Sequence, residues 1–217
     1  MRSFLVTDAI RDYAAAHSSW PADAAVRDLQ ERTRALGSAS GMQIADDQGQ
    51  LLTLLTRLVG ARSAVEVGTF TGYSSLCIAR GLADGGRLVC CDISEEWTSI
   101  GRDAWAAAGV DDRIDLRIAP ALETLRSLPD EATIDLVFID ADKGGYIGYW
   151  DELVPRVRPG GLLLADNVLW SGEIIEDAGD DVNLAALQAF NDHVAADDRV
   201  EVAVLTAFDG LTVARRL

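Results

Sequence analysis

The chain has a single lysine, Lys143, and its charged neighbours in the sequence are aspartates. Residues 136–146 read LVFIDADKGGY, whereas every other cationic side chain in the chain is an arginine. Arginine does not lose its proton in a protein, but a lysine that is partly buried or beside a bound cation can become neutral. This amine is therefore a candidate for proton transfer. A salt bridge from Lys143 to Asp140 or Asp142 is the simpler alternative.

Three oxygen-bearing side chains follow two apolar runs of the chain. Asp140 comes after LVFI, and Asp166 and Asn167 come after GLLLA. If these runs are neighbouring strands, their axes lie about 4.8 Å apart and the two carboxylates leave the sheet side by side. Such a pair repels unless a cation lies between them. Two carboxylates and an amide oxygen suit Mg²⁺, Mn²⁺ or Ca²⁺ rather than zinc. The alternative is that these acids cap helices or end strands in contact with water.

A glycine-containing turn follows the first apolar run, and an acid ends the second. Residues 66–74 read EVGTFTGYS, a G-x-x-x-G pattern that does not match the G-x-G-x-x-G dinucleotide fingerprint. Asp92 follows Gly68 by 24 residues, where an acid commonly accepts hydrogen bonds from ribose hydroxyls. Together these features favour a nucleoside-containing ligand. A tight turn with a solvated acid would give the same pattern.

The elements that must position these residues alternate between strands and helices. Near-continuous apolar runs occur at SAVEVG, RLVCCD, RIDLRI, DLVFID and GLLLAD, with helix-like segments between them. This alternation is typical of a parallel sheet covered on both faces, which binds ligands at the carboxyl ends of its strands. After a helix over 183–196, VEVAVLTAF and LTVARRL predict an antiparallel hairpin with Asp209 and Gly210 near the turn.

The first sixty residues are predicted to be helical. One helix places apolar or small residues at helical spacing and is expected to end at Gly37; these residues are Ala22, Val26, Leu29, Thr33 and Leu36. A second amphipathic helix covers DDQGQLLTLLTRLVG. We therefore expect one domain over 1–217, with N-terminal helices over 1–60 and a Rossmann-like α/β core over 61–217.

The composition excludes several classes of partner. The formal net charge is −16 without a basic stripe, so binding to nucleic acid or to an anionic membrane is not expected. No segment approaches the length of a membrane span, and the N-terminus, MRSFLVTDAIRD, has no apolar run of the secretory kind. Cys77, Cys90 and Cys91 lack metal-type spacing, and the adjacent pair would point to opposite faces of a strand. We expect free thiols and a cytoplasmic protein.

Several of these motifs occur in the same order in one known family. The segments MQIADDQGQLL, VEVGTFTGYSSLCIARGL, CDIS, FIDADKGGY, RPGGLLLADNVLWSG and FDGLTVAR resemble the cation-dependent class I O-methyltransferases, which include the caffeoyl-CoA and catechol O-methyltransferases and small bacterial relatives. The resemblance runs from about Met42 to the C-terminus. It implies a doubly wound seven-stranded sheet of order 3-2-1-4-5-7-6 with an antiparallel seventh strand, and S-adenosylmethionine as cofactor.

The resemblance also implies roles for individual residues. The cofactor would be contacted by eight residues, of which Asp92 would hold the ribose: Glu66, Gly68, Phe70, Tyr73, Ser74, Asp92, Ala121 and Asp140. Asp140, Asp166 and Asn167 would hold the divalent cation, with Mg²⁺ expected first and Mn²⁺ or Ca²⁺ as alternatives. Lys143 would be the general base. Met42, Lys143 and Trp170 would border the acceptor pocket.

The expected reaction is methylation of a small phenolic acceptor with two neighbouring hydroxyls. The family resemblance also implies that the protein forms a homodimer. A nicotinamide-dependent oxidoreductase on a related fold is one alternative, although the third glycine of its fingerprint is missing. A catalytically silent binding protein is the other, although it would have no need of the Asp140, Lys143, Asp166 and Asn167 set.

Overall fold

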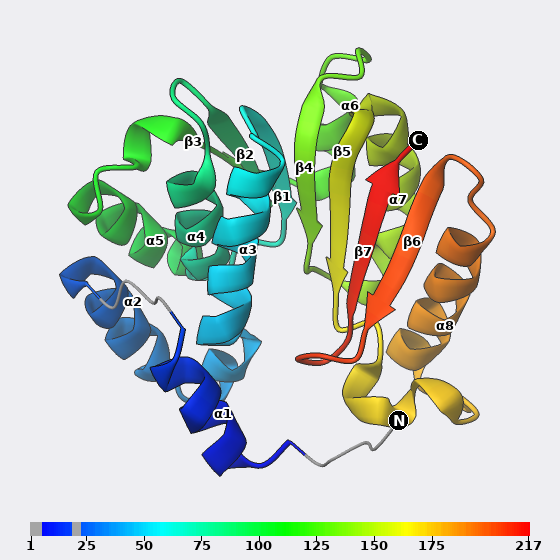
Figure 1. Cartoon of the computed structure of the whole chain (residues 1–217), viewed down its shortest axis with the longest axis horizontal. Coiled ribbons are helices and arrows are strands. Elements are labelled where there is room, and N and C mark those ends of the chain that lie inside the picture. The colour runs from blue at the N-terminus through cyan, green and yellow to red at the C-terminus, as the bar shows by residue number, and fades with distance from the viewer. Residues whose placement is uncertain (1–5, 19–22) are drawn as a thin grey trace.

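A seven-stranded sheet forms the centre of the computed structural model, which describes residues 6–18 and 23–217 (Figure 1). The strand order is β3-β2-β1-β4-β5-β7-β6. The strands are β1 Ser63–Val67, β2 Arg87–Asp92, β3 Ile114–Ile118, β4 Ile134–Ile139, β5 Val157–Asp166, β6 Val200–Leu205 and β7 Leu211–Arg216. The five strands β1 to β5 pair in parallel, and β7 pairs antiparallel to both β5 and β6. The predicted fold class and strand order are confirmed.

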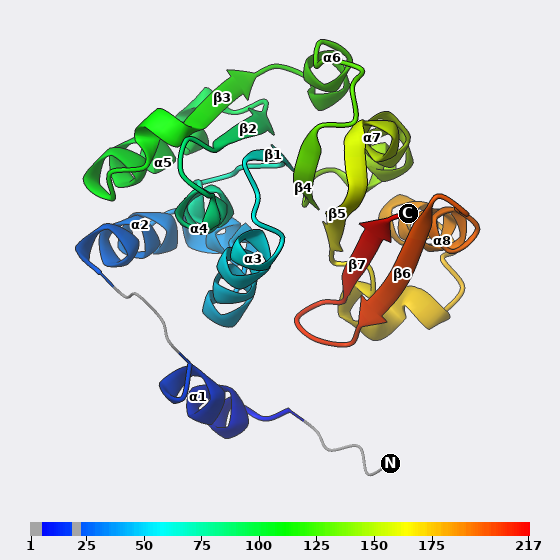
Figure 2. The same ribbon diagram turned by 45° about the horizontal axis from the view of Figure 1, so that its top comes forward.

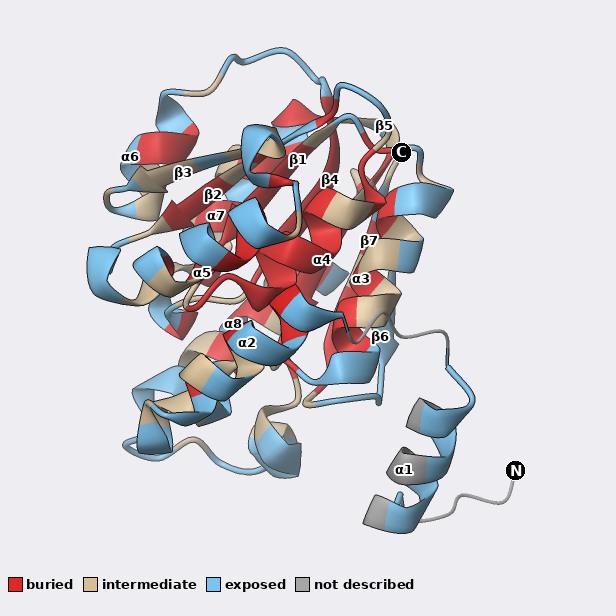
Figure 3. Cartoon of the chain, turned by 90° about the vertical axis from the view of Figure 1, so that its left-hand side faces the viewer, coloured by how far each residue is buried: buried red, intermediate tan, exposed pale blue. Residues whose placement is uncertain are grey.

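The parallel strands are apolar on both faces because helices cover both. The central strand β4 is buried at every position (Figure 3). Leu136 and Phe138 face one apolar cluster with α3 and α4, whereas Val137 and Ile139 face a second cluster with α7 and α8. This alternation follows from the two-residue period of a strand. It explains why no amphipathic pattern marks the central strands in the sequence.

The helices divide between the two faces of the sheet, as the two ribbon views show (Figures 1 and 2). Three helices precede β1 in the sequence: α1 Asp8–Ala16, α2 Ala24–Arg34 and α3 Asp46–Leu58. The core supplies α4 Tyr73–Gly81, α5 Glu95–Ala107, α6 Ala121–Arg126, α7 Tyr146–Leu153 and α8 Val182–Ala195. Helix α3 packs on α4, and α2 packs on α5. In the figures α1 lies apart from the sheet.

The helix predicted to end at Gly37 is shorter than expected. Helix α2 ends at Arg34, and Gly37 begins a 3₁₀ segment that runs to Met42. Gly37 has φ +66°, which an α-helix does not allow. Of the positions used for that prediction, Ala22 lies outside the described residues. The second predicted N-terminal helix is present as α3.

The structure places the three cysteines and also shows whether any of its helices could cross a bilayer. All three cysteines are buried free thiols. Within the described part of the chain, no helix combines the length and apolar character that crossing a bilayer requires.

Candidate active site

A cavity of about 1240 Å³ lies over the carboxyl ends of β1, β2, β4 and β5. Its wall is completed by the residues before α3 and by the turn between β6 and β7. A typical small-molecule site has a volume of roughly 300–1,000 Å³. The cavity therefore has room for two ligands, such as a cofactor and an acceptor.

The glycine turn after β1 lies directly against the loop after β4. Gly68 has φ +91°, and a Cβ atom there would lie 1.9 Å from the carbonyl oxygen of Asp140. Only glycine permits this contact. The Asp92 carboxylate, at the end of β2, accepts hydrogen bonds from the backbone N–H groups of Thr69 and Phe70 at 2.9 and 2.8 Å. Asp92 therefore shapes the turn in addition to facing the cavity.

Glu66 is the one predicted cofactor residue that the structure does not bring to the cavity. It is fully buried, on the face of β1 that packs against α4, and accepts hydrogen bonds from the hydroxyls of Thr69 and Ser75. Burial is the main cause that raises the pKa of Glu66 from 4.5 to about 7. Glu66 supports the turn from below, because alternation along β1 points its side chain away from the site.

The other predicted residues line the cavity together: Met42, Gly68, Phe70, Tyr73, Ser74, Asp92, Ala121, Asp140, Lys143, Asp166, Asn167 and Trp170. Their exposure differs. Met42 is about half exposed at the rim, whereas Tyr73 is buried and its hydroxyl donates to Asp46 of α3. Tyr73 therefore forms part of the wall between α3 and α4.

Asp140 and Asp166 leave neighbouring strands and are both withdrawn from solvent. Asp166 is 3% exposed, and burial followed by the charge of Asp140 raises its pKa. Burial also raises the pKa of Asp140, against the lowering effect of Lys143. Two carboxylates in this position are destabilised as anions, and a bound cation would relieve both effects.

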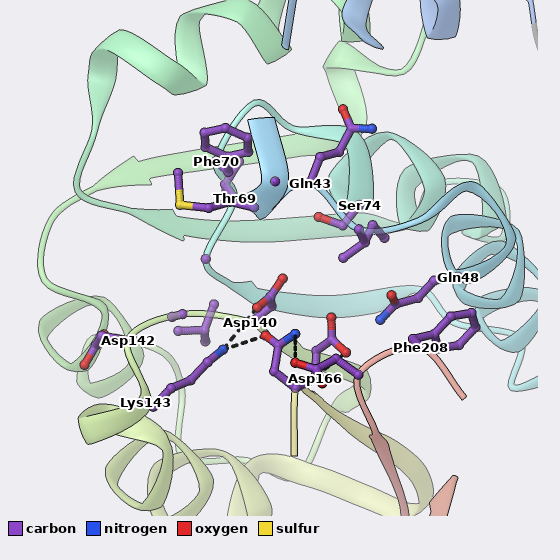
Figure 4. Close-up of a pocket in the computed structure, with 18 of the residues that line it drawn as sticks. Gln43, Gln48, Thr69, Phe70, Ser74, Asp140, Asp142, Lys143, Asp166 and Phe208 are labelled. Atoms are coloured by element: carbon purple, nitrogen blue, oxygen red, sulfur yellow. Dashed lines mark hydrogen bonds and ion pairs between the residues drawn. The ribbon is translucent and has the colours of Figure 1, made fainter. Parts of the chain in front are cut away.

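Lys143 is buried and its amine makes three polar contacts. Its Nζ donates to the Tyr146 hydroxyl and to Asn167 Oδ1, both at 2.7 Å. It also lies 3.4 Å from Asp140 Oδ1 (Figure 4). The Tyr146 hydroxyl in turn donates to the carbonyl oxygen of Asp166 at 3.0 Å. The salt-bridge contact with Asp140 is therefore present, but the two shorter contacts link Lys143 to the Asp166–Asn167 segment.

Asp142 has a different role from its neighbours. It accepts a hydrogen bond of 2.5 Å from the Tyr149 hydroxyl of α7. Tyr149 reaches it by crossing over Gly145, where a Cβ atom would lie 2.4 Å from the ring. The second glycine after the lysine, Gly145, thus makes room for Tyr149 at the start of α7.

Gln48 is a site residue that the sequence did not reveal. It lies in the first turn of α3, is 2% exposed and lines the cavity. Its amide faces Asp166 (Figure 4) and lowers the pKa of that carboxyl, but no hydrogen bond of ordinary length reaches its Nε2 among the described residues. A buried donor without a partner destabilises a protein by about 1–3 kcal/mol, so this nitrogen is expected to meet a bound group or a carboxylate. Tyr146 was also missed, because an aromatic residue at the start of a helix is usually part of the core.

The donor set suits a hard divalent cation. Asp140, Asp166 and Asn167 offer two carboxylates and one amide oxygen, a combination typical of Mg²⁺, Mn²⁺ or Ca²⁺. Within 6–18 and 23–217, no group of three or more His, Cys, Asp and Glu side chains has the arrangement of a metal site. A cation held by Asp140 and Asp166 would take the amide oxygen of Asn167 as its third side-chain ligand.

The fold and the cavity define the class of protein. Solved O-methyltransferases share this Rossmann-like fold over nearly their whole length. One is the Bacillus cereus enzyme in complex with SAH, which is 30% identical in sequence to this chain. The match covers 95% of this chain and 97% of the B. cereus chain, with a TM-score of 0.86. Another is TomG from Streptomyces achromogenes, in complex with SAM, which is 28% identical over 95% of each chain, with a TM-score of 0.87.

Sequence comparison identifies the family. The model of the O-methyltransferase family matches residues 16–217. "Probable caffeoyl-CoA O-methyltransferase 2" of Dictyostelium discoideum is 38% identical over 97% of this chain and 92% of its own length. The chain therefore belongs to the O-methyltransferase family. The predicted family and enzyme class are confirmed.

Proposed function

We propose that this O-methyltransferase uses S-adenosylmethionine and a divalent cation to methylate one hydroxyl of a small phenolic acceptor with two neighbouring hydroxyls. The observation that carries the proposal is the contact of Lys143 with Asn167 at 2.7 Å, beside the buried carboxylate of Asp166 and the partly buried carboxylate of Asp140. This arrangement combines a cation-binding set with an adjacent amine. An acceptor with two neighbouring oxygens suits it, because both can bind one cation.

The cavity is divided between the two ligands in this proposal. The cofactor would lie against the glycine turn and Asp92, between the exits of β1 and β2, and the acceptor would lie between Lys143, Met42 and Trp170. Asp140, Asp166 and Asn167 would hold the cation, Mg²⁺ first among the candidates. When bound, the cofactor supplies a methyl group on a positively charged sulfur, and the cation lowers the pKa of the acceptor hydroxyl.

The chain's own residues bind the acceptor and move its proton. Lys143 Nζ receives the proton of the hydroxyl that is methylated. Tyr146 holds the amine in place, and burial raises the pKa of Tyr146 well above its ordinary value, so its hydroxyl remains a donor. The buried walls exclude water from the acceptor oxygen, and positioning then contributes most to the rate.

The charges around the cavity favour an uncharged acceptor over a coenzyme A thioester. Five aspartates line it, and Lys143 is the only lysine or arginine among its described lining residues. The phosphates of coenzyme A would meet this acidic wall, whereas a free phenol would not. We therefore expect a small free catechol to give a higher kcat/KM than a caffeoyl thioester.

Two further parts of the proposal concern the setting of the protein. The three buried free thiols support a location of this protein in the reducing environment of the cytoplasm. The edge strand β6 exposes Val202 and Val204, an apolar surface that supports a homodimer.

Methylation assays with and without chelator test the proposal. Purified protein with S-adenosylmethionine and Mg²⁺ is expected to methylate members of a panel of catechols and hydroxycinnamates, and EDTA is expected to abolish turnover. Asp140→Ala should weaken metal binding in calorimetry. Turnover that survives EDTA would remove the cation from the mechanism. Cofactor binding without methylation of any panel member would favour a silent binding protein.

A further inference from the structure

Asp209 lies in the turn between β6 and β7, 42 residues after Asn167, and faces the candidate cation site. Its Oδ2 accepts a hydrogen bond of 3.4 Å from Asn167 Nδ2. Its Oδ1 accepts a hydrogen bond from the backbone N–H of Ser171. One carboxylate thus contacts two points of the loop that follows β5.

The contact with Asn167 determines which end of its amide points toward the site. The oxygen and nitrogen of an amide have nearly the same shape, so sterics alone do not choose between the two orientations. Here Asn167 Oδ1 accepts from Lys143 and Nδ2 donates to Asp209. A flipped amide would place Nδ2 against the Lys143 amine and Oδ1 against the Asp209 carboxylate. The contact with Asp209 would then be repulsive, and the hydrogen bond that Lys143 donates to Oδ1 would be lost, so Asp209 and Lys143 hold the amide from its two ends.

The same turn holds the backbone of the loop. Asn167, Trp170 and Ser171 have φ of +58°, +46° and +55°, in the left-handed region that non-glycine residues rarely adopt. Such residues persist only where their surroundings fix them. The Leu169 N–H donates to the Asp209 carbonyl oxygen at 3.0 Å, and the Ser171 N–H donates to the carboxylate. Asp209 therefore fixes the strained segment that carries Asn167 and Trp170.

We propose that Asp209 is a positioning residue: it orients the Asn167 oxygen toward the bound cation and holds the loop that carries Trp170. This inference rests on the proposed function, because it assumes that Asn167 is a cation ligand. Asp209 itself acts through Asn167 and is not a ligand in this proposal.

Calorimetric titration with Mn²⁺ tests the inference on the full chain, with S-adenosylhomocysteine titrated separately. In Asp209→Ala the amide can flip, so Mn²⁺ affinity is expected to fall at least tenfold while S-adenosylhomocysteine affinity changes less than twofold. Asp209→Asn keeps only one acceptor oxygen for the two donors, Asn167 Nδ2 and the Ser171 N–H. Its Mn²⁺ affinity should therefore lie between those of the wild type and the alanine variant. Asp198→Ala, which removes an exposed aspartate before β6, is the control and should match the wild type.

The possible outcomes separate the two proposals. Unchanged Mn²⁺ affinity in Asp209→Ala, with normal binding by the wild type, overturns the role of Asp209 alone. A parallel loss of melting temperature and of both affinities in Asp209→Ala and Asp209→Asn also overturns it, because that result describes a residue needed for the fold. If wild-type protein binds no Mn²⁺, the proposed function fails and Asp209 has no cation ligand to position.

Discussion

Lys143 occupies a position where the shape of its charged group matters as much as the charge. Its compact amine reaches Tyr146, Asn167 and Asp140 from one point, with two contacts of 2.7 Å. A planar guanidinium spreads its donors over a wider fork and cannot act as a proton acceptor. At this position a lysine therefore offers two properties that arginine lacks: a compact amine that reaches all three partners, and the ability to accept a proton when neutral.

Replacing Lys143 by arginine separates the two explanations of this residue. The variant keeps the positive charge beside Asp140, so a salt bridge would survive, but it has no amine to accept a proton. We expect turnover to fall by about 10²-fold or more, the usual contribution of general acid–base catalysis. Steady-state rates with a catechol acceptor measure this effect, and S-adenosylhomocysteine affinity serves as the folding control. Near-native turnover in Lys143→Arg would refute the general-base role.

The raised pKa of Glu66 predicts that the stability of the folded protein depends on pH, separately from catalysis. Its folded-state pKa of about 7 lies above the ordinary 4.5, so the folded chain binds this proton more tightly than the unfolded chain. The stabilising effect of the proton is complete below about pH 4.5 and is lost as the pH rises to about 7. The difference corresponds to about 3 kcal/mol.

Urea unfolding of wild type and Glu66→Gln at pH 5 and pH 8 checks this expectation. The wild type should lose more stability between the two pH values than the variant, which has no proton to release. The comparison between the two proteins removes the contribution of other titrating groups. Equal losses would mean that Glu66 keeps an ordinary pKa in the folded chain.

The start of α7 depends on a glycine that carries no chemistry itself. Tyr149 crosses over Gly145 to reach Asp142, and the turn over Lys143–Gly145 leads directly into the helix. The position of Lys143 is therefore connected to the packing of α7 through the pair Asp142 and Tyr149.

Gly145→Ala should disturb this element, because the added methyl group would overlap the Tyr149 ring. Overpacking of this kind typically destabilises by about 1–3 kcal/mol. Gly144→Ala is a matched control, since a Cβ atom at Gly144 meets no heavy atom within 4 Å. Thermal unfolding of both variants measures the difference. Equal melting temperatures would show that Tyr149 can move aside freely.

Two features of the whole surface bear on which partners the protein can bind: its acidic net charge and the open edge of its sheet. A net charge of −16 disfavours anionic partners, in agreement with the aspartates around the cavity. Strand β6 ends the sheet and exposes Val202 and Val204 at 39% and 47%. The homodimer proposed for this chain would use this apolar edge.

Light scattering after size exclusion tests the proposed homodimer. We expect a mass near twice the 23.3 kDa of one chain. Val204→Lys places a charge on the exposed edge and should shift the mass toward the monomer if β6 is part of the interface. A monomeric wild type would contradict the homodimer and leave the enzyme proposal in place.

The fold class and the segments that carry the site could be predicted from local patterns in the sequence, and the strand order from its family resemblance. This was possible because apolar runs and turn residues are local signals, and the site residues follow strand ends directly. Asp140, Lys143, Asp166 and Asn167 all stand at such ends, so their meeting could be expected from a parallel sheet. Their roles as ligands and base remain predictions.

The other side chains that complete the site could not be predicted, because tertiary packing brings them there. Asp209 reaches Asn167 because β7 lies beside β5, Gln48 reaches the cavity because α3 packs on α4, and Tyr146 links Lys143 to Asp166. The same packing turned Glu66 under the glycine turn and away from the cavity. These contacts join residues far apart in the chain, and their donors and acceptors follow from side-chain directions that no local pattern encodes.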